Sequence, residues 1–227
     1  MLWAIGAVIV LLLVFAPAFW VRWVMHAHNT QIEGMPGTGG ELAQHLAQRF
    51  DLDIEVESTE MGDHYDPSDK AVRLSPENFS GKSLTAIAVA AHEVGHAIQH
   101  HQQDPRLALR SKLVPLADRI GRLSTGFIWA APIVGILTRH PVPFSALVLV
   151  GVSGLLARML VHLVTLPIEF DASFNKALPL LQDGQYIAPG EEHVVRRILR
   201  AAALTYVAAA LADVLNLARW ASILLRR

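Results

Sequence analysis

The chain contains no cysteine. Disulfides are therefore excluded, and so is a zinc site built on thiolates, which leaves His, Asp and Glu as the available metal ligands. Charged residues are also scarce, at 17% of 227 residues, and the formal net charge is only −1. A chain without a basic excess lacks the usual electrostatic footprint of a nucleic-acid binder, so nucleic acid is not expected as a partner.

Apolar residues make up 52% of the chain and are concentrated in a few long runs. Leu2–Val21 contains no charged side chain and is long enough to cross a hydrocarbon core of about 30 Å. Arg22 follows at once, and tryptophans flank the run, as at a membrane interface. This pattern predicts an uncleaved anchor. A cleaved signal peptide is the alternative, and the missing basic region before the run argues against it.

Two more runs, Leu123–Thr138 and Phe144–Leu166, are separated by a short connection and predict a transmembrane hairpin. Arg158 and His162 lie four residues apart in the second run, so both face either the interior of a helical bundle or the near interface. A last apolar segment, residues 201–227, predicts either a further span or a helix buried against the others.

The run Ala90–Gln99 contains the motif His-Glu-x-x-His. Residues four apart share one face of a helix, so His92 and His96 can bind one metal ion. Glu93 follows the first histidine, where its carboxylate can take a proton from a metal-bound water. The preceding residues are free of Gly and Pro, and Ser83 is a suitable N-cap, which predicts a helix here.

The segments around this helix carry weaker signals. Thr38, or a glycine after it, is expected to start a short helix, Glu41–Phe50. Ile54–Glu57 and Ala71–Leu74 alternate apolar and polar residues and predict a small β-hairpin, to whose edge a peptide substrate could add itself. The predicted connection includes the turn-rich stretch Gly62–Pro67. Leu178–Glu192 is predicted to be a loop.

A catalytic zinc site usually has three protein ligands. Gln99 and Gln102 stand where a metzincin would have Gly and His, which excludes that class, and His100 lies a further turn along the helix. Leu181–Gly184 departs by an insertion from the Leu-Asp-Gly of intramembrane site-2 peptidases. Glu169, which emerges directly after the predicted hairpin, is the best candidate for the third ligand.

Five stretches together resemble one known family. They are Asp63–Pro67, Arg73–Ser75, Ala90–Gln99, Leu166–Ser173 and Ala202–Ala209. In this order, over nearly the whole chain, they look like the bacterial YugP-like membrane zinc metallopeptidases. The pattern is also similar to gluzincin membrane peptidases of the HtpX type, whose third ligand is the Glu of Glu-x-x-Ala-Asp.

In that second comparison Glu169 and Ala172 match, whereas Ser173 stands where those peptidases have Asp. The resemblance implies peptide-bond hydrolysis with one Zn2+ on His92, His96 and Glu169, and Glu93 as the general base.

The roles of three neighbouring side chains are less specific. Asp171 is expected either to orient a ligand histidine or to be an ordinary helix N-terminal aspartate. His64 or Tyr65 could contact substrate or stabilise an oxyanion, the alternative being a role confined to the turn. The alternative to an enzyme is a zinc-binding membrane scaffold with a vestigial hydrolase site.

We therefore predict a mostly α-helical, multi-span membrane bundle with a zincin-like helix and a small β-hairpin on one membrane face. The predicted segments are an anchor (1–22), a catalytic segment (23–122), a transmembrane hairpin (123–166), a third-ligand segment (167–200) and a C-terminal hydrophobic helix (201–227). The predicted partners are the lipid bilayer and a protein or peptide substrate.

The catalytic face should carry 14 of the 19 Lys and Arg residues. By the positive-inside rule, this excess of positive charge predicts that the catalytic face lies on the cytoplasmic side. The protein itself is expected in the inner membrane of a bacterial cell.

Overall fold

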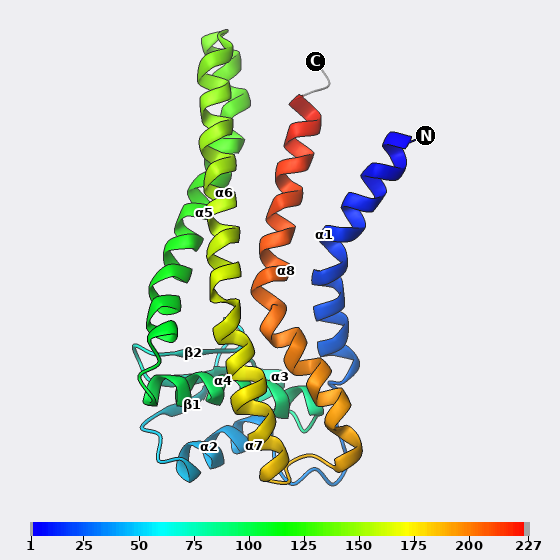
Figure 1. Ribbon diagram of the computed structural model, residues 1–227, viewed down its shortest axis with the longest axis vertical. Helices are drawn as coiled ribbons and strands as arrows, with labels where there is room; N and C mark the ends of the chain where they lie inside the picture. The colour runs from blue at the N-terminus through cyan, green and yellow to red at the C-terminus, as the bar shows by residue number, and fades with distance from the viewer. Residues whose placement is uncertain (1, 225–227) are drawn as a thin grey trace. The chain divides into compact units, whose positions relative to one another are not determined.

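A computed structural model of the chain describes residues 2–224, with the side chains of residues 15–208 and 211. The fold is mostly helical, as predicted, and contains one small sheet (Figure 1). The elements in chain order are α1 (Leu2–Ala27), α2 (Gly39–Arg49), β1 (Glu55–Ser58), β2 (His64–Asp66), β3 (Ala71–Leu74), α3 (Pro76–Ser80), α4 (Leu84–His101), α5 (Pro105–Thr138), α6 (Pro141–Phe170), the π-helix η1 (Asp171–Ala177), α7 (Leu178–Asp183), the 3-10 helix η2 (Pro189–Glu191) and α8 (Glu192–Leu224). The last three residues of the predicted C-terminal segment, 225–227, and residue 1 of the predicted anchor lie outside the described residues.

The chain forms two compact units, each assembled from separate stretches of sequence. The first unit comprises Met1–Ala18, Arg110–Thr165 and Tyr206–Arg227, and the second comprises Phe19–Leu109 and Leu166–Thr205. The long helices α1, α5, α6 and α8 therefore each contribute to both units. The division into five consecutive segments stays a prediction.

In the first unit, α5 and α6 run side by side and are joined by a short connection (Figure 1). The helices approach closely at Gly154 of α6, which has no Cβ. A Cβ at this position would overlap the hydroxyl oxygen of Ser124 on α5. Among the described residues, two helical stretches, Pro105–Thr138 and Pro141–Asp183, are long and apolar enough to cross a membrane. Their most apolar 18-residue windows are only 22% and 17% buried, whereas the core helix of a soluble protein is mostly buried.

The two polar residues predicted to share a face of α6 have separate partners. Arg158 forms an ion pair with Asp118 of α5, with 3.1 Å between the guanidinium nitrogen and the carboxylate oxygen. His162 is buried and stacks on Tyr206, with ring centroids 5.5 Å apart. His162 therefore faces the packed interior of this unit, which is the first of the two predicted orientations.

In the second unit, the sheet has the strand order β1-β3-β2. β1 pairs in parallel with β3, and β2 pairs with β3 in antiparallel fashion. The predicted hairpin of Ile54–Glu57 with Ala71–Leu74 is therefore wrong, because these two runs are parallel and the turn-rich stretch between them contains β2. Alternation identifies a half-buried strand but carries no information about its partner or direction.

The helix α4 is the core of the second unit, and every residue from Leu84 to Gln99 is buried. Its N-terminus is capped as predicted, since the Ser83 hydroxyl accepts a hydrogen bond from the backbone N–H of Ala86 at 3.1 Å. Thr38 caps α2 in the same way and, together with Glu41, forms a complete capping box.

The predicted loop Leu178–Glu192 is wrong over its first part, where η1 continues directly into α7. The proline after Leu178 lies within the first two positions of α7, where a missing backbone N–H costs little. Leu178 and Leu181 are buried, and this apolar spacing of three residues is that of a helix face packed on a core.

Candidate metal centre

The two histidines of the motif lie one turn apart on α4, in the buried core of the second unit. The exposed fractions of His92 and His96 are 4% and 1%. Their ring centroids are 4.8 Å apart, and the ring planes cross at 74°. Both imidazoles therefore converge on one point from a single helix face, as their spacing predicts.

Glu169, at the end of α6, approaches the same point from the other side. Its Oε2 lies 3.3 Å from Nε2 of His96 and 3.5 Å from Nε2 of His92. The possible ligand atoms of His92, His96 and Glu169 all lie within 4.8 Å of one another, so these three side chains could hold one metal ion. The structure thus brings together the three residues predicted to be ligands, although 73 residues separate His96 from Glu169.

The two Nε2–Oε2 distances fit ligands that share an ion. Tetrahedral zinc with bonds of ~2.0–2.1 Å separates its ligands by about 3.3–3.4 Å. A charge-assisted hydrogen bond between an imidazolium and a carboxylate would be shorter, at about 2.7–2.9 Å. Glu169 is 1% exposed. A carboxylate buried so deeply needs a compensating cation, and two imidazoles with one carboxylate are a donor set that zinc prefers.

Each histidine has a hydrogen-bond partner on its other ring nitrogen. Nδ1 of His92 lies 3.0 Å from the hydroxyl of Ser173, and Nδ1 of His96 lies 2.9 Å from Oε1 of Gln99. Both partners are fully buried. In each ring the nitrogen that faces Glu169 is Nε2, and partners on Nδ1 hold the rings in this orientation.

The helix α4 and the segment after Glu169 pack closely because α4 has a glycine at their contact. A Cβ on Gly95 would lie 2.7 Å from the carbonyl oxygen of Ala172 in η1, closer than a Cβ is tolerated. η1 is a seven-residue π-helix, and such interruptions of α-helices are frequent at functional sites. Gly95 therefore allows α4 to lie directly against the segment that follows Glu169.

Glu93 is 7% exposed and follows His92 directly on α4. The buried part of α4 therefore carries one carboxylate beside the two imidazoles. Its role as general base remains a prediction.

The structure assigns local contacts to the two candidates in β2. Nδ1 of His64 lies 2.8 Å from the carbonyl oxygen of Gly62, in the turn that precedes the strand. The hydroxyl of Tyr65 lies 2.7 Å from Nδ1 of His100. Burial and the neighbouring Asp66 raise the pKa of Tyr65 to about 12, so its hydroxyl stays protonated. A role for either residue in contacting substrate remains a prediction.

Asp171 reaches a ligand histidine through an intermediary. Its Oδ2 accepts a hydrogen bond of 2.8 Å from Nε2 of Gln99, whose Oε1 faces His96. Sequence reasoning considered Gln99 only as a departure from the metzincin pattern. Its position three residues after His96, on the same helix face, is the signal that could have identified it.

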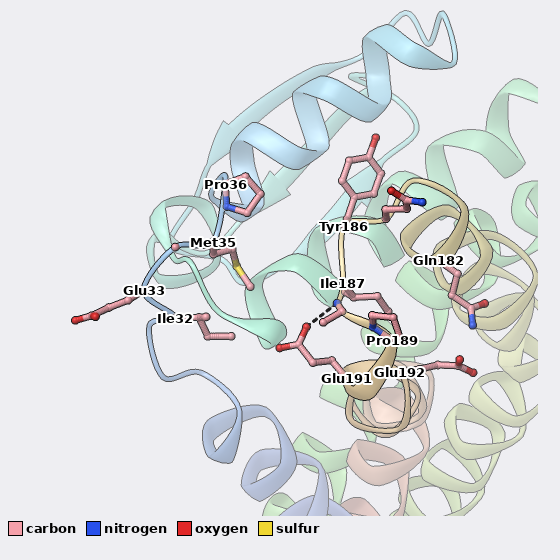
Figure 2. A pocket seen from close by; sticks show the side chains of 13 residues that line it. Ile32, Glu33, Met35, Pro36, Gln182, Tyr186, Ile187, Pro189, Glu191 and Glu192 are labelled. Carbon is pink, nitrogen blue, oxygen red and sulfur yellow. Dashed lines mark hydrogen bonds between the residues drawn. The ribbon is translucent and has the colours of Figure 1, made fainter.

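A separate cavity of about 750 Å³ lies between the loop after α1 and the loop after α7 (Figure 2). Met35, Pro36 and Tyr186 line it, and Glu191 closes one side by accepting a hydrogen bond from the backbone N–H of Ala188 at 2.9 Å. None of the residues of the His-Glu-x-x-His motif is among its described lining residues. The cavity is therefore distinct from the candidate metal centre.

Two comparisons with known proteins agree with this chemistry. A family model described as "Putative neutral zinc metallopeptidase" matches residues 3–225. A curated relative from Bacillus subtilis (strain 168), named "Putative membrane protease YugP", is 34% identical over 217 residues, which cover 92% of each chain. No solved structure matches the chain. The predicted resemblance is thus confirmed: the chain belongs to the YugP-like family of neutral zinc metallopeptidases.

Proposed function

We propose that the protein is a membrane-bound zinc metalloendopeptidase whose active site is formed by His92, Glu93, His96 and Glu169. The observation that carries this proposal is the convergence of two buried imidazoles and one buried carboxylate on a single point. The family and the curated relative support the same class of reaction.

In this proposal His92, His96 and Glu169 hold one zinc ion. Zinc at this position supplies Lewis-acid chemistry, since it lowers the pKa of a water toward ~7 and polarises the scissile carbonyl. Three protein ligands are the usual number for a catalytic zinc site, and an ion held by these residues would remain accessible to a water and the substrate.

Glu93 acts as the general base and then as the general acid. It follows the first ligand on α4 and shares the buried environment of the imidazoles. Its carboxylate takes the proton of the attacking water and passes this proton to the leaving amine. Groups in this role typically contribute about 10²–10⁴-fold in rate.

The substrate is proposed to be a protein or peptide in an extended conformation. The sheet lies against α4, and β2 is one of its two edge strands. An edge strand presents backbone N–H and C=O groups to which an extended peptide can add by main-chain hydrogen bonds. This arrangement would select substrates by backbone conformation more than by side chain.

The protein is proposed to span the inner membrane of a bacterial cell several times, with the metal centre on the cytoplasmic face. The two long, apolar and largely unburied helical stretches support the membrane assignment, as does the name of the relative. The distribution of Lys and Arg along the sequence supports the cytoplasmic face.

The test compares cleavage of casein by the full chain and by its Glu93→Gln variant, with Glu60→Gln, an exposed loop residue, as the matched control. We expect Glu93→Gln to lose at least about 100-fold in cleavage rate while its zinc content stays equal to that of the wild type. Equal cleavage by wild type and Glu93→Gln would overturn the proposal. Stoichiometric zinc without cleavage by either would favour the membrane scaffold.

A further inference from the structure

A histidine can bind zinc through Nε2 only if that nitrogen carries no proton, so its Nδ1 has to carry one. The side chain of Gln99 determines this for His96. Its Nε2 donates to two acceptors, the carbonyl oxygen of Ile168 at 3.0 Å and Oδ2 of Asp171 at 2.8 Å. The amide is thereby oriented with Oε1 toward His96, and a carbonyl oxygen can only accept.

Asp171 is itself held in place. Its Oδ1 accepts a hydrogen bond of 2.9 Å from Nδ2 of Asn175 in the next turn, and a guanidinium nitrogen of Arg106 lies 3.8 Å from the same oxygen. The carboxylate therefore keeps one oxygen on Gln99 and the other on a donor. A chain of hydrogen bonds runs from Asp171 through Gln99 to the imidazole of His96.

The other histidine has a different and uncharged support. The hydroxyl of Ser173 donates to the carbonyl oxygen of Leu199 at 3.1 Å. Because its one proton is used there, Ser173 accepts from Nδ1 of His92 at 3.0 Å. The two imidazoles thus have the same tautomer, but among these hydrogen bonds a carboxylate supports His96 and a hydroxyl supports His92.

We propose that Gln99 and Asp171 act as a pair of positioning residues for His96, and that Ser173 acts independently as the positioning residue for His92. This inference rests on the proposed function only in that the cluster binds zinc. Gln99 transmits the effect of Asp171: the carboxylate orients the amide, and the amide holds the proton of His96 on Nδ1. Removal of an outer hydrogen-bond partner of a metal ligand typically lowers metal affinity about 10–100-fold.

The coupling of the pair can be measured without any cleavage assay. The zinc dissociation constant of the full chain in detergent would be determined by chelator competition in the Glu93→Gln background. Gln99→Met and Asp171→Asn would be measured singly and together, with Asp183→Asn, an exposed carboxylate on α7, as the control. We expect each single substitution to raise the dissociation constant about 10–100-fold, and Asp183→Asn to leave it unchanged.

In the double variant the dissociation constant should be no higher than that of Gln99→Met alone, because Asp171 acts only through Gln99. Ser173→Ala should add its full effect to either. The visible spectrum of bound Co2+ should change with Gln99→Met and not with the control. A double variant whose loss is the product of the single losses would overturn the proposal, as would a dissociation constant for Gln99→Met within twofold of the parent.

Gln99→Glu keeps an acceptor for His96 but removes the donors to Asp171 and Ile168. This variant replaces Gln99→Met in the test if Gln99→Met does not fold. In that background Asp171→Asn should no longer weaken zinc binding, and a remaining tenfold loss would contradict the relay.

The outcomes also separate the two proposals. Zinc binding with the predicted coupling but no casein cleavage by the wild-type chain would overturn the peptidase function alone. Casein cleavage by the wild-type chain with independent, multiplying losses of zinc affinity would overturn the relay alone.

Discussion

Two acidic side chains of the second unit differ in the groups that surround them. Asp63 accepts hydrogen bonds from the backbone N–H and the hydroxyl of Ser75 and from the side-chain amide of Asn78, at 2.7–3.0 Å. It is satisfied within the protein and holds the loop before β2 in place. Glu169 faces the Nε2 atoms of two imidazoles at 3.3 and 3.5 Å. A cation bound between these three groups would stabilise the buried carboxylate.

Glu169→Ala should therefore abolish tight zinc binding. Removing a ligand leaves two imidazoles, and we expect a loss of more than about 100-fold, beyond the range for outer-shell partners. The measurement is zinc content after dialysis, by elemental analysis. Asp183→Ala, exposed on α7, is the matched control and should keep full occupancy. Unchanged zinc in Glu169→Ala would rule out Glu169 as the third ligand.

At the scale of elements, the site depends on the contact between α4 and η1. Gly95 lies between His92 and His96 in the sequence and touches the backbone of Ala172. The same contact brings Gln99 and Ser173 within reach of their partners. A change at this contact should therefore affect both stability and the geometry of the cluster.

Gly95→Ala should destabilise the protein by about 1–3 kcal/mol, the usual cost of overpacking a core, and should also weaken zinc binding. Gly190→Ala is the control, since a Cβ at Gly190 has no heavy atom within 4 Å. We expect its effect to stay within about 0.5 kcal/mol. Denaturant unfolding and chelator competition would measure the two effects. A Gly95→Ala protein with unchanged stability would show that α4 and η1 do not pack this closely.

The sheet is held together by an ion-pair cluster around Arg73. This β3 residue pairs with Glu57 of β1, with Asp66 of β2 at 2.8 Å and with Asp69 at 2.6 Å. Burial by itself would raise the pKa of Asp66, but hydrogen bonds from the backbone of Ser68 and Asp69 and from Arg73 lower it below its ordinary value of 3.8.

Because the folded-state pKa of Asp66 is depressed, its ionisation stabilises the fold fully above the unfolded-state pKa. This contribution is lost as the pH falls below about 4 and through the folded-state value. We expect Asp66→Asn to be less stable than wild type at pH 7, and the difference to shrink toward pH 3. Denaturant midpoints at both pH values would measure it, with Asp51→Asn, exposed at the end of α2, as the control. A difference that is equal at both pH values would contradict the assignment.

At the scale of the whole molecule, the missing cysteines make the proposed orientation directly testable. An introduced cysteine is then a unique thiol. His140 lies in the exposed connection between α5 and α6, and Asp53 lies in the exposed segment before β1, with a side chain that is 92% exposed. The two positions should lie on opposite faces of the membrane if α5 and α6 form a transmembrane hairpin.

A membrane-impermeant maleimide should label His140→Cys in intact cells and Asp53→Cys only after the cells are permeabilised. The reason is that most Lys and Arg residues accompany the metal-centre segments, and positive charge is retained in the cytoplasm. The cysteine-free parent controls for unspecific labelling. Labelling of Asp53→Cys in intact cells would place the metal centre outside the cytoplasm.

Local patterns predicted those features that depend on neighbours in the sequence. Thr38 and Ser83 cap helices because the side chain of each accepts a hydrogen bond from the backbone N–H three residues later. The runs that form β1 and β3 were predicted in the same way, whereas β2 was interpreted as part of a turn-rich stretch. Strand direction was not predicted, because β1 and β3 are parallel neighbours although β2 lies between them in the sequence, and no local pattern encodes that crossover. Likewise, the helix α7 was missed because turn-forming residues close to it in sequence suggested a loop.

The sequence by itself determined the shared face of His92 and His96, because residues four apart on an uninterrupted helix always lie one above the other. It also indicated Glu169 as a candidate, through order along the chain and a family resemblance. Only the tertiary structure decided which side chains support the two imidazoles. Ser173 lies 81 residues from His92, and Asp171 lies 72 residues from Gln99. Contacts over such separations arise from packing of α4 against η1, and sequence spacing does not encode them.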